Sequence, residues 1–134
     1  MRLLTISCFI ALCIAPPAYS DELMDESLKN CDKNQLSMNF CARHFYDVAD
    51  AELNDLFKQK IATLEDVKTK DRFRDAQRAW VVFRDKDCLF QVPTRDGSRT
   101  NWPMLHWACM KIHTQQRVIE IKEFIKCTYD NCFQ

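Results

Sequence analysis

The chain has 134 residues, with 19 Lys and Arg against 19 Asp and Glu, so its formal net charge is zero. A nucleic-acid-binding protein would carry a marked basic excess, and an inhibitor steered to a very basic enzyme by its overall field would be markedly acidic. Neither field is present. We therefore expect no nucleic-acid partner, and we expect any protein partner to be selected by local shape and local charge.

The first twenty residues predict export. Arg2 precedes an apolar run over residues 3–15, and two prolines then lead to Ala-Tyr-Ser over residues 18–20. This is the pattern of a cleaved secretory signal peptide. The apolar run is too short for a transmembrane helix, which needs about 18 to 20 residues. We expect residues 21–134 to form a single periplasmic or secreted domain, with no stable membrane insertion after cleavage.

Three amphipathic segments follow, because the mature chain has long stretches without glycine or proline and its apolar residues recur every three or four positions. The first runs from about Gln35 to Val67, and its predicted apolar face is Cys41, Phe45, Ala49, Leu53, Leu56, Ile61 and Leu64. The second runs from about Arg72 to Phe90, and its face is Phe73, Ala76, Trp80 and Phe83, flanked by Val81 and Cys88.

A polar segment from Gln91 to Trp102 separates the second helix from the third. It contains Pro93 and Gly97 and has no helical or strand period, so we expect the longest loop of the domain there. The third helix is expected to begin at Pro103, a residue suited to a first helical turn. It would reach about Lys126, with a face formed by Leu105, Ala108, Cys109, Ile112, Gln116, Ile119 and Phe124.

Strand patterns are nearly absent, so the fold class is expected to be all-α. We predict a small three-helix up-down-up bundle stapled by disulfides. Removing the signal leaves six cysteines, and an even number in an exported chain implies disulfide bonds. Six cysteines allow fifteen pairings in principle. Chain order favours three local pairs, Cys31 with Cys41, Cys88 with Cys109, and Cys127 with Cys132.

Two stretches resemble the N-terminal domain of the LprI-type lysozyme-inhibitor family. They are M-N-x-C-A-x-x-x-Y-x-x-A-D-x-x-L-N over residues 38–54 and A-Q-R-A-W-V-V-F-R-D-K-D-C over residues 76–88. The matching residues are Gln35, Met38, Asn39, Cys41, Ala42, Tyr46, Ala49, Asp50, Leu53, Asn54, Ala76, Gln77, Arg78, Ala79, Trp80, Phe83, Arg84, Asp85, Cys88, Gly97, Ser98, Pro103, Met104, Cys109, Thr114 and Arg117. The chain departs from the family pattern at Asn34, where threonine is usual, and in its tail with Cys127 and Cys132.

The resemblance implies a small exported helical domain, some members of which inhibit lysozyme. Such an inhibitor would block a cleft whose chemistry rests on two carboxylates. Loops on a rigid scaffold are frequent binding sites, and the loop side chains suited to insertion are Arg95, Asp96, Arg99, Asn101 and Trp102. The alternative for this loop is a solvated connector tied by the Cys88–Cys109 bridge. Exposed aromatics would favour binding, and those to check are Trp102, Trp107, Tyr129 and Phe133.

A polar motif is expected to set the register of the first two helices. Its members are Asp50, Asn54, Gln77, Arg78, Trp80 and Arg84. Trp80 and Arg84 lie four residues apart, which allows the guanidinium to stack on the indole. We expect Arg84 or Arg78 to meet Asp50 between the helices. The alternative role of the motif is direct contact with a partner.

The sequence contains no strong pattern of catalytic residues, so we expect that the protein is not an enzyme and that it binds no cofactor and no metal. His106, Cys109 and His113 have ligand spacing on one helix, but in an exported chain Cys109 is expected to be oxidised. The same reason excludes a nucleophilic Cys41 beside His44. The sequence therefore favours a binding protein that inhibits a lysozyme or another cell-wall hydrolase. The alternative is an envelope structural or stress protein without an enzyme target.

Overall fold

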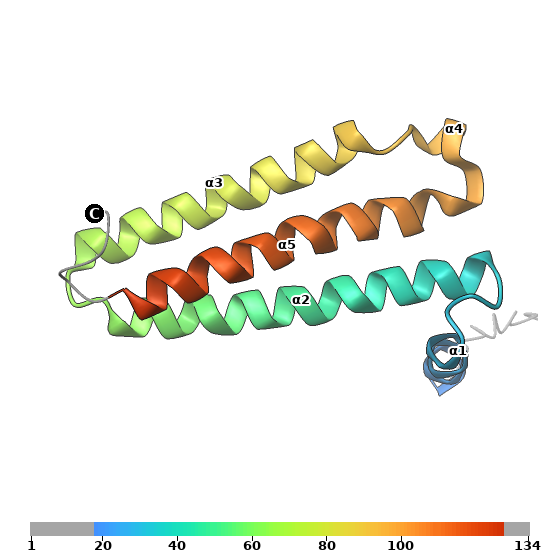
Figure 1. Cartoon of the computed structure of the whole chain (residues 1–134), viewed down its shortest axis with the longest axis horizontal. Helices are drawn as coiled ribbons and strands as arrows, with labels where there is room; N and C mark the ends of the chain where they lie inside the picture. The colour runs from blue at the N-terminus through green and yellow to red at the C-terminus, as the bar shows by residue number, and fades with distance from the viewer. Residues whose placement is uncertain (1–17, 128–134) are drawn as a thin grey trace, which may run out of the picture.

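The computed structural model describes residues 18–127 and is helical over almost all of that range, with no strand within it (Figure 1). The elements are α1 (Ala18–Lys29), α2 (Gln35–Thr63), α3 (Val67–Gln91), α4 (Arg95–Ser98), the 3₁₀ turn η1 (Arg99–Asn101) and α5 (Trp102–Lys126). Among the described helices, none is both long enough and apolar enough to cross a bilayer. The predicted signal segment lies outside the described residues up to residue 17, and its last three residues begin α1.

The all-α prediction is confirmed, whereas the prediction of three helices is incomplete. The three predicted helices correspond to α2, α3 and α5, and the structure adds α1, α4 and η1. Successive long helices run in opposite directions (Figure 1). The most extensive packing joins α2 to α5, while α1 packs on α2 and α3 approaches α5 over a smaller area.

Side-chain caps define where α2 and α3 begin. The side chain of Asn34 accepts a hydrogen bond from the Ser37 backbone N–H at 2.9 Å, and that of Asp66 accepts one from the Thr69 N–H at 2.7 Å. Each cap satisfies a donor that the first helical turn leaves unpaired. The helix predicted from Gln35 to about Val67 is α2, which ends at Thr63. It does not reach Val67, because Asp66 caps the start of α3.

The segment from Gln91 to Trp102 is not the irregular loop that its composition predicts. Residues 95–98 form α4 and residues 99–101 form η1. The backbone N–H of Gly97 donates to the Thr94 carbonyl at 3.0 Å, which closes a turn at the start of this segment. Polar composition alone does not distinguish such short helical turns from coil.

The core lies mainly between α2 and α5, with contributions from α3, and it forms two clusters. One contains Tyr46, Cys88 and Met110, with Trp107 and Cys109 packed against it. The other contains Leu53, Val118 and Ile121, and the partly buried residues packed against it are Leu56, Phe57, Phe73, Trp80 and Ile125.

Several residues of the predicted apolar faces are exposed. Phe45 is 50% exposed and Phe83 is 55% exposed, and on α5 both Ile112 and Ile119 lie largely in solvent. The buried residues of α5 are instead Met110, Thr114, Val118 and Ile121. Because α5 has apolar side chains around much of its circumference, the three-to-four-residue period does not specify which face is buried.

Two of the three expected disulfides are present in the described residues. Cys31 bonds to Cys41, and Cys88 bonds to Cys109. The expected pairing of Cys127 with Cys132 lies outside the described residues, because Cys132 is not among them. The Cys88–Cys109 bond joins the C-terminal part of α3 to α5.

Replacing both Cys88 and Cys109 with alanine should lower the free energy of unfolding by about 3 kcal/mol. The bond closes a loop with a sequence separation of 21 residues, and the chain-entropy relation gives roughly this value for such a loop. Urea denaturation followed by circular dichroism measures the change. An unchanged denaturation midpoint would show that helix packing alone holds α3 in place.

Candidate functional site

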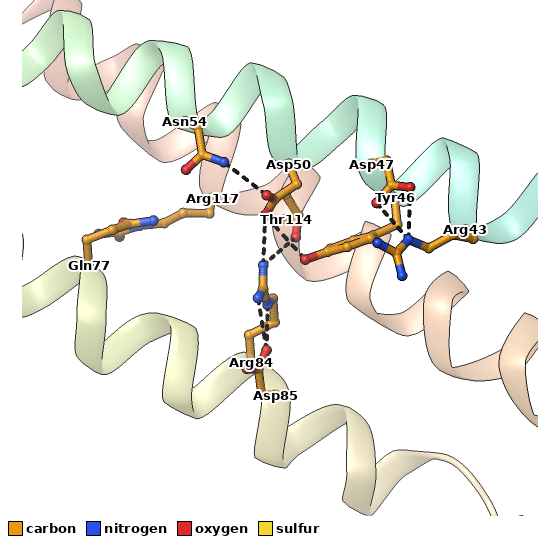
Figure 2. Close-up of polar contacts among 10 residues, drawn as sticks. All are labelled: Arg43, Tyr46, Asp47, Asp50, Asn54, Gln77, Arg84, Asp85, Thr114 and Arg117. Carbon is orange, nitrogen blue, oxygen red and sulfur yellow. Dashed lines mark hydrogen bonds and ion pairs between the residues drawn. The ribbon is translucent and has the colours of Figure 1, made fainter. Parts of the chain in front are cut away.

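A buried arginine joins the three long helices (Figure 2). The Arg84 side chain, from α3, is only 6% exposed. Its Nη1 donates to Asp50 Oδ1 on α2 at 3.2 Å and to Thr114 Oγ1 on α5 at 3.3 Å, and its Nε donates to Asp85 Oδ1 at 3.0 Å. A guanidinium presents several donors in one plane, which suits it to such a junction. Of the two arginines expected to meet Asp50, the structure selects Arg84.

Asp50 is held by three side chains. Besides Arg84, it accepts hydrogen bonds from the Tyr46 hydroxyl at 3.3 Å and from Asn54 Nδ2 at 2.9 Å. Burial raises the pKa of Tyr46, and the neighbouring Asp50 charge raises it further, while Arg84 opposes both effects. The phenol therefore stays protonated and remains a donor to Asp50 at neutral pH.

Aromatic rings enclose the guanidinium of Arg84. Its Cζ lies 5.5 Å from the Tyr46 ring centroid and 5.1 Å from that of Trp80. The stacking of Arg84 on Trp80 is the contact that their four-residue spacing predicts. Arg117 of α5 also lies over Trp80, at 5.7 Å. Long side chains thus bridge the space between α3 and the other two helices.

The polar motif borders a groove between α2 and α3. Arg117 Nε donates to Gln77 Oε1 at 3.0 Å, which fixes Gln77 on the α3 side. The groove has a volume of about 310 Å³ and is lined by Asp50, Leu53, Asn54, Phe57, Arg74, Gln77, Arg78 and Val81. Four of the six motif residues therefore line one groove. The other two, Trp80 and Arg84, make the contacts between helices described above.

The segment between α3 and α5 is anchored by stacking. The guanidinium of Arg95 lies 4.5 Å from the Trp102 ring centroid, and Trp102 stacks on His106 with 4.6 Å between centroids. The Asn39 side chain of α2 also fixes this segment. Its Nδ2 donates to the carbonyl of Thr100 in η1 at 2.9 Å, and its Oδ1 accepts from the N–H of Met104 in the first turn of α5 at 3.2 Å.

The loop residues expected to contact a partner therefore differ in exposure. Arg95 and Asp96 are exposed, whereas Asn101 and Trp102 are partly buried. Asn101 Oδ1 is a buried atom with no hydrogen-bond partner in the described part of the chain. The side chain of Arg99 is outside what the structure describes.

An exposed aromatic that the sequence did not single out adjoins this segment. Phe90, in the last turn of α3, is 86% exposed. The aromatics selected from sequence differ, because Trp102 and Trp107 are partly buried and Tyr129 and Phe133 lie outside the described residues. The helical period contained no signal for this exposure, since Phe90 lies seven positions after Phe83, which the sequence assigned to the apolar face of the helix.

The three residues with ligand spacing on α5, His106, Cys109 and His113, are not the group that the structure brings together. His106 stacks on Trp102 and meets Trp107 edge to face. The group with ligand atoms within 4.8 Å of one another is Cys88, Cys109 and His113. Both sulfurs of that group form the Cys88–Cys109 disulfide, so neither offers a thiolate to a metal.

Replacing Asp50 with asparagine should lower the free energy of unfolding by about 2 kcal/mol, because hydrogen bonds to charged groups contribute roughly 1.5 to 3 kcal/mol. The loss stays within this range because Arg84 keeps Asp85 as a partner. Asp47→Asn is the matched control, since Asp47 pairs with Arg43 on the exposed surface of α2 and such pairs contribute about 0 to 1 kcal/mol. Urea denaturation compares the two variants. Equal effects would contradict a structural role for the buried ion pair.

Stability should decrease below about pH 6.5 through His106. Burial lowers the pKa of His106 from its ordinary 6.5, with further lowering by Arg95 and Arg84 and partial opposition from Asp85. The unfolded chain then binds this proton more readily than the folded chain, so the contribution is present above about pH 6.5 and is lost as the pH falls. A His106→Phe variant keeps a stacking ring without the charge. Its free energy of unfolding, measured in urea across this range, should fall less than that of the parent; parallel pH profiles would assign the loss to other groups.

Comparison with known proteins places the chain in a family. Residues 28–121 match the family model described as lysozyme inhibitor LprI. The chain is 29% identical to the uncharacterized protein R02472 of Rhizobium meliloti (strain 1021), over 94% of this chain and 97% of that protein. It is 27% identical to the uncharacterized protein YecT of Escherichia coli (strain K12), over 61% of this chain and 59% of that protein. No solved structure matches. Since the matched region includes α2, α3 and most of α5, the chain belongs to the LprI family of lysozyme inhibitors.

Proposed function

We propose that this protein is an exported binding protein that inhibits a lysozyme or a related peptidoglycan-degrading enzyme. The observation that carries the proposal is the family match over residues 28–121. The two disulfides support an oxidising compartment such as the periplasm or the exterior. The family name supports a binding role over an enzymatic one.

We assign the contact with the enzyme to the end of the molecule where α3 leads into α4 (Figure 1). Phe90 offers a large exposed apolar ring, and Arg95 offers an exposed cation five residues later. Aromatic residues and arginine are enriched at the energetic centres of protein interfaces. A cation at this position suits a hydrolase cleft that contains two carboxylates.

The anchoring of this end supports its use in binding. The Cys88–Cys109 bond ties α3 to α5 close to this end. The segment itself is fixed by the hydrogen bond from Asn39 and by the stacking of Arg95 on Trp102. A segment ordered before association loses less conformational entropy when it binds. The same contacts would also serve a simple connector, so a measurement of inhibition has to separate the two roles.

The oxidised protein should inhibit hydrolysis of a peptidoglycan suspension by at least one lysozyme in a panel, with a dose-dependent fall in the rate of clearing. The double variant Phe90→Ala/Arg95→Ala should weaken inhibition about tenfold or more, which corresponds to 1.4 kcal/mol or more of binding free energy.

The control double variant, Val67→Ala/Arg72→Ala, removes the same kinds of exposed side chain from the opposite end of α3. It should inhibit like the parent. An equal loss in both double variants would remove the assignment to the α3–α4 end. An absence of inhibition across the panel would contradict the proposed function itself.

A further inference from the structure

The groove between α2 and α3 contains polar groups that the fold leaves unused. Its volume of about 310 Å³ is at the lower end of the range for small-molecule sites, which is about 300 to 1,000 Å³. Four of its lining residues come from α2 and four from α3. The groove therefore has two distinct walls, with room for a ligand about the size of a capped dipeptide.

Two amides on opposite walls each have one end free. A carboxylate only accepts hydrogen bonds, so Asn54 must face Asp50 with its nitrogen, and its oxygen is left over. A guanidinium only donates, so Gln77 must face Arg117 with its oxygen, and its nitrogen is left over. No hydrogen bond from residues 18–127 reaches Asn54 Oδ1 or Gln77 Nε2. The groove thus offers an acceptor on α2 and a donor on α3, which complement the N–H and C=O of a ligand amide.

The α3 wall carries two positive charges that a ligand can recruit. Arg74 Nη1 lies 2.9 Å from Asp71, and Arg78 Nη1 lies 3.0 Å from Asp75, each within a single turn of α3. Both arginine side chains are substantially exposed, at 42% and 75%, and such pairs contribute only about 0 to 1 kcal/mol. A carboxylate can therefore replace either aspartate at small free-energy cost and form paired hydrogen bonds with the guanidinium.

The other charges of the groove do not oppose an anion strongly. Asp50 is the only acidic residue in the lining, and its carboxylate already receives Arg84, Tyr46 and Asn54. The apolar part of the lining consists of Leu53, Phe57 and Val81. These side chains suit small alkyl groups on the same ligand.

We infer that this groove binds an acylated dipeptide with a free carboxylate. The carboxylate lies against Arg74 and Arg78, the amide lies between Asn54 and Gln77, and the methyl groups lie on the apolar lining. Two sources carry this chemistry, the D-alanyl ends of peptidoglycan stem peptides and the L-residue C-termini of polypeptides. The inference does not depend on inhibition of an enzyme, because no enzyme takes part in the binding.

Calorimetric titration of the oxidised protein tests the site with N-acetyl-D-alanyl-D-alanine and with its L,L isomer, each at millimolar concentration. At least one acid should bind with a saturable isotherm, and its C-terminal amide should bind at least tenfold more weakly. Stronger binding of the D,D acid identifies the stem peptide as the source, and stronger binding of the L,L acid identifies a polypeptide C-terminus. The inference is wrong if neither acid saturates, or if the amides bind as well as the acids.

The double variant Arg74→Gln/Arg78→Gln should bind the preferred acid at least tenfold more weakly than the parent. Arg72→Gln is the control, because Arg72 is an exposed arginine of α3 that does not line the groove, and it should leave the affinity unchanged. Since the replaced side chains are exposed, helicity and the urea midpoint should stay close to those of the parent. Undiminished binding by the double variant, or an equal loss in the control, would place the ligand elsewhere.

Discussion

The burial of one guanidinium determines how the three long helices sit together. Arg84 reaches Asp50 on α2 and Thr114 on α5, and its guanidinium lies over the rings of Tyr46 and Trp80. A buried charge without partners would be strongly unfavourable. The position of α3 is therefore tied to the position of these partners, and the packing of each helix constrains the other two.

The same arrangement explains why α3 can stand apart from α2. Leucine- or alanine-sized contacts would draw two helices to about 8 to 10 Å between axes, whereas arginine, tryptophan and glutamine reach farther. Gln77 of α3 and Arg117 of α5 also bridge two helices through long side chains, and Arg117 pairs in addition with Glu120 at 2.7 Å. The groove between α2 and α3 is thus a result of the side chains that bridge the helices (Figure 2).

The sequence predicted those features that depend on local chemistry. The long helices follow from the scarcity of glycine and proline, and the disulfides Cys31–Cys41 and Cys88–Cys109 follow from chain order. It did not predict which face of α5 is buried. Thr114 is fully buried although it is polar, because it accepts a hydrogen bond from Arg84. Such a preference depends on a residue 30 positions away and has no trace in a helical period.

The pairing of Asp50 was predictable only as a choice between two arginines. Arg78 and Arg84 both lie on α3, and the choice depends on how far α3 is shifted along α2. The structure directs Arg84 inward and leaves Arg78 at the edge of the groove with Asp75. The exposure of Phe90 depends likewise on the tertiary arrangement, which leaves this residue in the last turn of α3 uncovered.

The burial of Cys88 also determines where the Cys88–Cys109 bond is open to chemical attack. Cys88 has no exposed surface, whereas Cys109 is only partly buried. A small thiol reagent is therefore directed to the sulfur of Cys109, and the exchange releases Cys88 as a thiolate inside the fold. That thiolate is held next to the mixed disulfide on α5 and can displace the reagent, which restores the bond.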